Sequence, residues 1–496
     1  MSAALSSDRV RPFIGGSSCT PEDGGDYDIT EPATGRVLAH ATAATPATID
    51  RAVDAAHDAF AKWSRMGAGE RSRLLHALAD RVAVEADELA ETEARNVGKA
   101  VSSVRAEIGH VISTFRYFGS VAGVISGRAG RIGGSIDFAS YQEPVGVVAQ
   151  IVPWNYPVLM AAWKIAPVLA TGCATVLKPD LATPLTALRI AELVMEVGAP
   201  AGVVNVVPAD GAQVGSHLVA HPGIAKVAFT GSTASGTEVM RLAATNLSRV
   251  TLELGGKGAN VVFADTDLTQ AVAGAVWGAY SSAGQSCEAR SRILVHESIS
   301  ERFVDAFVRV TQAVPVGDPL DPATAVGSLI STRHRDKVHG YVQRAADAGS
   351  QVLLGGRIPD GDGAYYPLTL VRPHETATEI VREEVFGPVA TIETFATEQE
   401  AIDKANDTPY GLLATVWTGS GATARRVSHR LDFGTVAVNH PLTTFPGVPF
   451  GGVKHSGFGR EFAIESLHDY LATKSLTAWV SPRTSSLVDT SMVNDN

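Results

Sequence analysis

Cys287 is the residue best placed for covalent chemistry, and it stands in the short stretch SAGQSCE at 282–288. A thiolate nucleophile needs a lowered pKa, access to substrate and a base or dipole nearby, and small neighbours leave room for substrate to approach. A lone cysteine is more often a small buried hydrophobe. Cys173, in the apolar run 172–177, fits that second interpretation, and Cys19 lies in a polar stretch and receives no role.

Glu253 interrupts an apolar strand in the sequence TLELGGK at 251–257. A carboxylate flanked by leucines needs a physical reason, because burial of an unpaired charge is costly. It is either a catalytic base or the partner of an ion pair with Lys257, and the residues alone favour neither. Its separation from Cys287 is 34 positions (287 − 253), so only the fold can bring the two together.

Asn155 follows the end of a predicted strand, within PWNYP at 153–157. Ligands collect at the carboxyl ends of strands in open α/β sheets. An asparagine amide at such a place can donate a hydrogen bond to a developing oxyanion. Taken singly, however, the motif is better explained as a Pro-rich turn in which the side chain bonds the backbone.

A glycine turn at 231–236, GSTASG, follows an apolar strand over 226–229 and opens a helix over 233–244. Such a turn offers N–H groups and a positive dipole end to a phosphate. The sequence has no G-x-G-x-x-G, and the turn lacks the Lys-Ser/Thr that would make it a Walker A motif, so ATP use is not supported. An ordinary strand-to-helix turn with a Ser or Thr N-cap is the more frequent origin of this pattern.

Repeated strand–helix units would position these residues. The predicted strands are 145–152, 173–177, 203–207, 226–229 and 252–254, and the predicted helices between them include 156–170 and 183–197. A second run begins after Gly255, with strands at 261–263, 293–295 and 352–354 and helices at 268–282, 300–313 and 333–347. The pattern predicts an α/β fold with mainly parallel sheets. The polar segment 126–141 is either a solvated loop or a hairpin that packs on another subunit.

Composition limits the class of protein. The 496 residues suit two or three domains, and the net charge of −11 argues against a nucleic-acid partner. Three cysteines are too few for a disulfide framework and favour a reducing compartment, and the first 14 residues lack the apolar core of a signal peptide, so we expect a cytoplasmic protein. The most apolar stretch, 157–177, contains Lys164 and Pro167, which argues against a membrane span.

Taken together, these motifs and several others resemble the aldehyde dehydrogenase superfamily. The matching segments span roughly 150–461 in the order and spacing of that family; they are PWNYP at 153–157, KP at 178–179, FTGS at 229–232, LELGGK at 252–257, GQSC at 284–287, EEVFGP at 383–388, PFGGVK at 449–454 and SGFGRE at 456–461. That many ordered matches make chance similarity very improbable.

The resemblance implies a role for each matched residue. Cys287 would be the nucleophile, and Glu253 would be the general base. The Asn155 amide and the Cys287 backbone N–H would form the oxyanion hole. Lys164 and Glu461 would relay protons. The dinucleotide would be held without the usual fingerprint by Ile151, Pro153, Trp154, Lys178, Gly211, Gly231, Ser232, Leu254, Glu384 and Phe386. No metal is assigned.

The resemblance also implies a division of the chain. A Rossmann-like dinucleotide-binding domain would comprise 1–125 and 143–254, a second α/β catalytic domain 255–450, and a small β oligomerisation element 126–142 and 470–496. A homodimer or homotetramer is expected. Members that prefer NAD usually carry Glu two positions beyond the Pro of the KP motif, whereas this chain has Leu181 there and Asp180 before it. We expect NAD as the cofactor, with NADP open.

The expected reaction is oxidation of an aldehyde to a carboxylic acid through a Cys287 thioester, with hydride transfer to NAD(P). Because CoA-acylating relatives usually lack the base at Glu253, hydrolytic release is favoured over an acyl-CoA product. A cysteine hydrolase without cofactor and a binding protein that keeps the fold without chemistry are the rival hypotheses. The sequence does not identify the aldehyde; the candidate lining residues are Tyr156, Trp163, Ser286, Glu288, Phe445 and Phe450.

Overall fold

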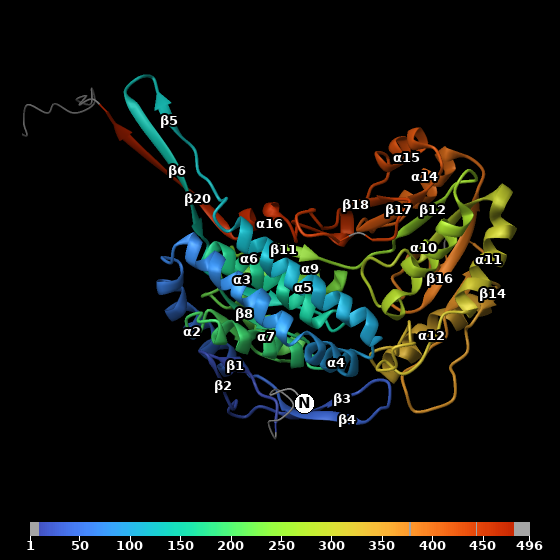
Figure 1. The fold of residues 1–496 in the computed structure, drawn as a ribbon, viewed down its shortest axis with the longest axis horizontal. Helices are drawn as coiled ribbons and strands as arrows, with labels where there is room; N and C mark the ends of the chain where they lie inside the picture. The colour runs from blue at the N-terminus through green and yellow to red at the C-terminus, as the bar shows by residue number, and fades with distance from the viewer. Residues whose placement is uncertain (1–8, 376–377, 443, 481–496) are drawn as a thin grey trace, which may run out of the picture.

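A computed structural model describes residues 9–375, 378–442 and 444–480. It contains two α/β parts side by side and a narrow three-stranded arm that projects from one of them (Figure 1). The predicted α/β fold class, with a Rossmann-like part and a second α/β part, is confirmed. Among the helices of these residues, none has the length and apolar character needed to cross a membrane.

The first part is built on an eight-stranded sheet. Its strand order is β19 (Gly457–Phe458), β11 (Arg249–Glu253), β10 (Lys226–Thr230), β7 (Val147–Ile151), β8 (Ala174–Lys178), β9 (Val204–Val206), β1 (Phe13–Ile14) and β2 (Ser17–Ser18). Strands β7, β8, β9, β10 and β11 run parallel to one another. Every residue of β7, β8 and β10 is buried, as expected for parallel strands covered on both faces.

Helices cover both faces of this sheet. They are α2 (Pro46–Trp63), α3 (Ala68–Val84), α4 (Ala86–Val97), α5 (Val101–Val121), α6 (Pro157–Thr171), α7 (Leu185–Glu196), α8 (Ser216–Ala220), α9 (Thr233–Ala243) and α16 (Ile464–Asp469). The central helix α6 begins with Pro157 and ends at Gly172, whose left-handed φ of 89° favours glycine. All its residues are buried, which explains the long apolar stretch in the sequence.

The second part is a seven-stranded sheet with its own helices. The strand order is β14 (Gln351–Leu354), β15 (Thr369–Arg372), β16 (Val389–Phe395), β13 (Arg292–His296), β12 (Ala259–Val262), β17 (Leu413–Trp417) and β18 (Thr435–Val438). The helices are α10 (Leu268–Tyr280), α11 (Ser300–Gln312), α12 (Thr332–Asp347), α13 (Glu379–Arg382), α14 (Glu398–Asn406) and α15 (Gly421–Ser428). Each part therefore has its own buried apolar core.

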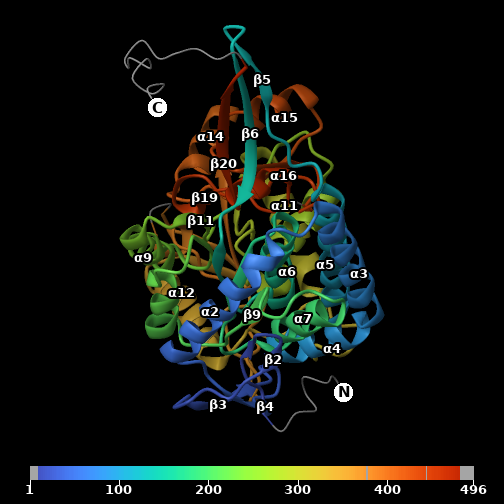
Figure 2. The ribbon, with the colours of Figure 1, turned by 90° about the vertical axis from the view of Figure 1, so that its left-hand side faces the viewer.

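The predicted segment 126–141 forms a hairpin rather than a solvated loop. It contains β5 (Ala129–Ile132) and β6 (Ile136–Pro144), and β20 (Leu471–Trp479) pairs with β6 along its whole length. Figure 2 shows this arm extending beyond the helices of the first part. A separate ribbon of β3 (Asp26–Thr30) and β4 (Val37–Thr42) lies near the start of the chain. The part of the predicted 470–496 segment from residue 481 onward lies outside the described residues.

One predicted strand needs correction. The strand expected at 252–254 runs from Arg249 to Glu253, because backbone pairing with β10 begins at the polar pair Lys226 and Arg249. Leu254 consequently follows the strand, and its N–H donates to the carbonyl of Ser456 instead of to the sheet. Glu253 therefore marks the carboxyl end of β11.

Candidate active site

A cavity of about 740 Å³ lies at the carboxyl ends of β7, β8 and β10. From β7 the chain proceeds to β8 and β9 on one side, whereas β10 and β11 lie on the other, so this is where the direction of strand order changes. Ligands of open α/β sheets bind at such a switch point. Of the ten residues predicted to hold a dinucleotide, nine line the cavity: Ile151, Pro153, Trp154, Lys178, Gly211, Gly231, Ser232, Glu384 and Phe386.

The tenth predicted residue, Leu254, does not line the cavity. Its side chain is buried and packs behind the cavity, where a Cβ on Gly236 would come within 2.5 Å of a Leu254 methyl carbon. Because Gly236 lies in the first turns of α9, Leu254 fixes how closely that helix approaches the strand β11. The role predicted for Leu254 in holding the dinucleotide stays a prediction.

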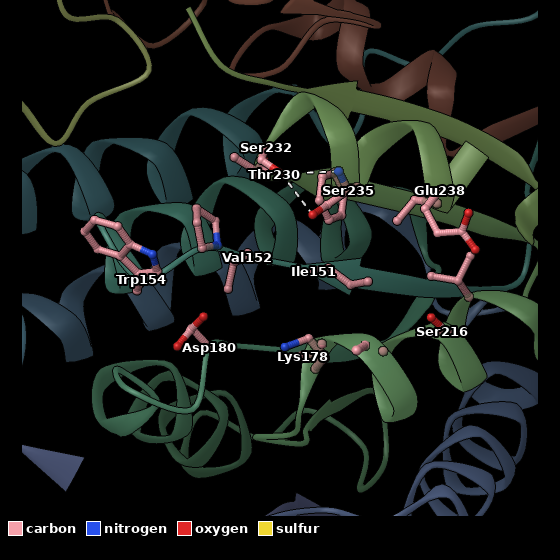
Figure 3. Close-up of a pocket in the computed structure, with 18 of the residues that line it drawn as sticks. Ile151, Val152, Trp154, Lys178, Asp180, Ser216, Thr230, Ser232, Ser235 and Glu238 are labelled. Carbon is pink, nitrogen blue, oxygen red and sulfur yellow. Dashed lines mark hydrogen bonds between the residues drawn. The ribbon is translucent and has the colours of Figure 1, made fainter. Parts of the chain in front are cut away.

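One wall of the cavity carries the start of helix α9. Ser232 is the N-cap residue, and its Oγ accepts a hydrogen bond of 3.2 Å from the backbone N–H of Ser235 (Figure 3). The first N–H groups of a helix lack partners within the helix and attract anions. A Cβ on Gly231 would come within 2.5 Å of the Phe229 ring. The glycine turn therefore leaves space for a group of phosphate size beside the helix start.

The opposite wall carries Lys178 and Asp180, which lie on the same side of the cavity in Figure 3. The Lys178 ammonium donates to the carbonyl oxygens of Pro179 and Ala209, both at 3.0 Å. Burial lowers the pKa of Lys178. An ammonium has three protons, so one remains for a ligand hydroxyl. Leu181, where the family often has Glu, does not line the cavity, whereas the Asp180 carboxylate does.

Residues of the second part also line the cavity. The backbone N–H of Gly256 donates to the Glu384 carboxylate at 2.8 Å, and burial raises the pKa of Glu384 to about 7. Phe386 has a left-handed φ of 59° and packs edge-to-face on Trp154, with ring centroids 5.3 Å apart. His334, to which no sequence motif pointed, bonds the Phe386 carbonyl at 2.7 Å and also lines the cavity.

A second, smaller cavity of about 70 Å³ adjoins the first, because Pro153, Thr230, Gly231 and Phe386 line both. Cys287, Glu253 and Asn155 all line it. The structure therefore brings together three predicted catalytic residues that are far apart in the sequence. It places them in a cavity that shares Phe386 with the larger one.

The backbone before Cys287 is unusual. Ser282, Ala283 and Gly284 have φ values of 51°, 55° and 67°, a left-handed run that only glycine adopts readily. Cys287 itself keeps some exposure, through the cavity that it lines. Burial raises the pKa of the thiol well above its usual value, and the carboxylates of Glu288, Glu384 and Glu253 raise it further. The thiol therefore needs a proton acceptor before it can act as a nucleophile.

Asn155 is held by one hydrogen bond, from its Nδ2 to the carbonyl of Gln285 at 2.9 Å. Gln285 is in turn fixed, since its Oε1 accepts from the Ile330 N–H at 2.9 Å. The amide nitrogen of Asn155 has a second proton, and the side chain lines the same cavity as the sulfur. The Cys287 backbone N–H lies against its own sulfur and favours the thiolate. The Asn155 amide and the Cys287 N–H are therefore the candidate donors of an oxyanion hole.

Glu253 forms no ion pair with Lys257, so that alternative from the sequence is wrong. Lys257 is buried elsewhere and donates to the carbonyl of Ile380 at 2.8 Å. Within the described residues, neither carboxylate oxygen of Glu253 has a hydrogen-bond partner, although the side chain is buried. Burial raises the pKa of Glu253 well above its usual value, with a further rise from Glu461. An unpaired acid in a cavity wall is suited to proton transfer.

Lys164 does not line the cavity but reaches it through Glu461. The Lys164 side chain is fully buried in α6, and its ammonium donates to the Glu461 carboxylate at 2.5 Å. Glu461 lines the smaller cavity, next to Glu253. Lys164 is thus separated from the smaller cavity by Glu461.

The outer walls of the smaller cavity are mostly aromatic and apolar. Five of the six candidate lining residues from the sequence line it: Tyr156, Trp163, Ser286, Glu288 and Phe450. Phe445 does not line it, and its side chain is 42% exposed. Leu159, Met160 and Thr444 also line it, and no sequence pattern pointed to them. Leu159 and Met160 are successive residues of α6, and a helical apolar run does not reveal which of its residues face a cavity.

A switch-point cavity that adjoins a smaller, cysteine-lined cavity is the arrangement expected of a dehydrogenase that uses a dinucleotide and a thiol. The chain belongs to the aldehyde dehydrogenase family, whose model matches residues 19–476. It is an NAD(P)-dependent aldehyde dehydrogenase, which confirms the predicted family and activity class.

Similar proteins agree with this assignment. Aminoaldehyde dehydrogenase 1 of Pisum sativum, a peroxisomal protein, is 40% identical over 461 residues, which cover 91% of this chain and 92% of that protein. The structure of a betaine aldehyde dehydrogenase from Staphylococcus aureus in complex with NAD+ has a TM-score of 0.93 and 38% identity, covering 96% of this chain and 95% of that one. The structure of PnpE in complex with nicotinamide adenine dinucleotide has a TM-score of 0.94 and 40% identity, covering 96% and 98%.

Proposed function

We propose that this enzyme oxidises an aldehyde to a free carboxylic acid, with Cys287 as nucleophile, Asn155 in the oxyanion hole and Glu253 as general base. The observation that carries the proposal is that these three side chains line one cavity, which shares a wall with the dinucleotide-sized cavity. The rival of a cofactor-free cysteine hydrolase leaves that larger cavity without a purpose.

In the first half of the reaction, the Cys287 thiol loses its proton to solvent water, and the thiolate sulfur bonds to the aldehyde carbon. The carbonyl oxygen becomes an oxyanion, which the Asn155 amide and the Cys287 N–H stabilise. Bound NAD would accept the hydride that leaves this carbon as the oxyanion collapses to a thioester. The larger cavity fits that cofactor: the α9 N-terminus and Gly231 leave room for phosphate, and Lys178 keeps a free proton for a ribose hydroxyl.

In the second half, Glu253 takes a proton from water as the water oxygen bonds to the thioester carbon. The carbon–sulfur bond breaks, and the acid leaves. General-base help of this kind contributes about 10²- to 10⁴-fold to a rate. The unpaired oxygens of Glu253 are free to accept that proton. We assign Lys164 and Glu461 to the onward relay of this proton, since they form a direct ion pair beside Glu253.

NAD is the proposed cofactor, in preference to NADP. Asp180 lines the cavity on the same side as Lys178, so a 2′-phosphate bound there would meet a carboxylate. Like charges at close range disfavour binding. Asp180 thereby takes the part that a Glu at position 181 has in other family members.

The smaller cavity favours neutral or cationic aldehydes over acidic ones. The carboxyl groups of Glu253, Glu288 and Glu461 line it, and its lining within the described residues includes no Lys or Arg. The aromatic walls of Tyr156, Trp163 and Phe450 accept apolar groups, and aromatic faces also attract cations. Steady-state kinetics with short, long, aromatic, amino and acidic aldehydes test this, and an acidic aldehyde as the best substrate would contradict it.

We further propose a cytoplasmic homodimer or homotetramer that assembles through the arm of β5, β6 and β20. The arm exposes the apolar side chains Tyr141, Leu476 and Trp479, which are 50%, 55% and 58% exposed. Apolar groups gathered on a projecting sheet favour association with a second copy. Sedimentation equilibrium of the whole protein and of a Leu476→Glu, Trp479→Glu variant tests this; a monomeric parent protein would contradict it.

The direct test of the reaction is NADH formation on mixing protein, NAD and aldehyde. We expect Cys287→Ser to abolish it and the product to be the free acid. Product formation as an acyl-CoA only when CoA is added would contradict the hydrolytic step. Acid formation without NAD would favour the hydrolase instead.

A further inference from the structure

The smaller cavity contains one acid that the proposed mechanism does not use. Within the described residues, three carboxyl groups line it. Glu253 is assigned as the base, and Glu461 forms an ion pair with Lys164. Glu288 is the third, and it directly follows the nucleophile Cys287 in the sequence. The mechanism thus leaves a carboxyl group next to the nucleophile without a role.

The backbone of Glu288 is held on both sides. Its N–H donates to the Ser286 Oγ at 3.4 Å, and its carbonyl accepts from Nη1 of Arg290 at 2.9 Å. A second nitrogen of Arg290 donates to the carbonyl of Pro441 at 2.6 Å. Arg290 is only 1% exposed, and its guanidinium lies over the Trp277 ring, 5.4 Å from the centroid. A planar guanidinium that bonds two carbonyls fixes the point from which the Glu288 side chain extends.

The guanidinium of Arg290 and the carboxylate of Glu288 stabilise each other as charges. Burial lowers the pKa of Arg290, and the negative charge of Glu288 opposes that shift. Glu288 lines the smaller cavity, whereas Arg290 does not. Lys99 and Glu107, which lie nearby, pair with each other at 2.8 Å and do not line the cavity either. The cavity is therefore in contact with the negative member of the Arg290–Glu288 pair and not with the positive one.

A carboxylate next to the nucleophile opposes the first chemical step. Burial raises the pKa of the Cys287 thiol, and Glu288 is the carboxylate that adds most to this rise, ahead of Glu384 and Glu253. The thiol must lose its proton before the sulfur can attack an aldehyde. A cation bound beside Glu288 would offset the unfavourable charge. A positively charged substrate would therefore favour the thiolate that attacks it.

We infer that Glu288 is a specificity-determining residue for short aldehydes that carry an ammonium group: its carboxylate binds the ammonium, which offsets the negative charge beside the Cys287 sulfur. This inference rests on the proposed function and deepens it. The cavity volume of about 70 Å³ limits the length of the substrate. The rings of Trp163 and Phe450, with centroids 5.5 Å apart, add aromatic faces that attract cations. The ammonium keeps its protons, and the thiol proton leaves to solvent water.

Two aldehydes of equal length test the inference. 3-Aminopropanal carries an ammonium group where butanal carries a methyl group, and an alkyl amine is protonated near neutral pH. We expect the parent enzyme to have the higher kcat/KM with 3-aminopropanal. Glu288→Gln should lower that value by about 10- to 100-fold, the loss typical of a hydrogen bond to a charged group.

The same substitution should raise kcat/KM for butanal by about threefold. Loss of a unit charge within roughly 10 Å, at an effective dielectric of about 20, lowers a thiol pKa by about one unit. The thiolate fraction then grows by about tenfold, but a thiolate of lower pKa is a weaker nucleophile, which offsets part of the gain. Opposite changes for the two aldehydes exclude a merely structural role, which would lower both values.

Glu288→Asp is the matched control, because it keeps the charge on a shorter side chain and should keep the preference for 3-aminopropanal. If Glu288→Gln does not fold, inhibition of the parent enzyme decides. Propylammonium should inhibit butanal oxidation at least about tenfold more strongly than 1-propanol, which has a similar shape without the charge.

Equal losses for both aldehydes in a folded Glu288→Gln protein would overturn the inference. An unchanged preference for 3-aminopropanal in that variant, a parent enzyme that prefers butanal, or equal inhibition by propylammonium and 1-propanol would overturn it as well. In all these cases the parent enzyme still forms NADH from butanal, so the proposed function stands. A parent enzyme that forms no NADH from either aldehyde would instead contradict the proposed function, and the inference with it.

Discussion

Replacing Glu253 with Gln should separate the two halves of the reaction. Glutamine has nearly the same shape but cannot take a proton from water. The first turnover needs no water, so the variant should form about one NADH per active site and then stall. The steady-state rate should fall by about 10²- to 10⁴-fold, the contribution typical of a general base.

The structure also predicts how the fold will respond. The Glu253 oxygens have no hydrogen-bond partner within the described residues, so the substitution breaks no bond. A buried acid without a partner is costly, and the neutral amide should leave the melting temperature unchanged or slightly higher. The Glu253 carboxylate also contributes to the raised pKa of the Cys287 thiol, and its removal should lower that pKa.

Rapid mixing with absorbance detection of NADH measures the burst, and Glu253→Asp is the matched control because it keeps the acid on a shorter side chain. The rate of NADH formation in the burst should greatly exceed the steady-state rate in Glu253→Gln, and should exceed it by less in Glu253→Asp. A Glu253→Gln enzyme with the parent steady-state rate would refute the reasoning. So would a variant that loses the burst but remains folded and binds NAD, because Glu253 would then be needed before hydride transfer.

The remaining predictions concern the oxyanion hole and the cofactor cavity. Asn155→Ala should lower kcat by about 10²- to 10³-fold with little change in NAD affinity. An equal loss of kcat and of NAD affinity would contradict a role of Asn155 in the oxyanion hole. Asp180→Asn keeps the hydrogen bond from the Ala182 N–H but removes the charge, so the preference for NAD over NADP should fall by about tenfold in kcat/KM. Gly231→Ala should displace the Phe229 ring and weaken NAD binding. Calorimetry should show a Kd for NAD about tenfold higher.

The sequence predicted best the features that are local. Strands β7, β8 and β10 were recognisable because parallel strands buried on both faces read as apolar runs. The Gly231–Gly236 turn was recognisable because glycine spacing and a following helix are short-range signals. The motifs at Asn155, Glu253 and Cys287 became informative only together, through the order in which they resemble one family.

The sequence predicted poorly what depends on distant contacts. The four-residue separation of Glu253 and Lys257 could not show whether they form an ion pair. Lys257 instead donates to the carbonyl of Ile380, which is 123 positions away in the sequence. The Lys164–Glu461 ion pair joins residues 297 positions apart. Leu254 and Phe445 do not line the two cavities, since a sequence pattern identifies a segment but not the direction of each side chain.

The most direct measurement of the central claim is peptide mass spectrometry of Glu253→Gln protein, quenched in acid after the NADH burst with one aldehyde and NAD. A thioester intermediate predicts that the peptide containing Cys287 gains the mass of the acyl group, in an amount equal to the burst, and that Cys287→Ser shows neither. An acyl group on another residue, or a full burst with an unmodified Cys287 peptide, would contradict it.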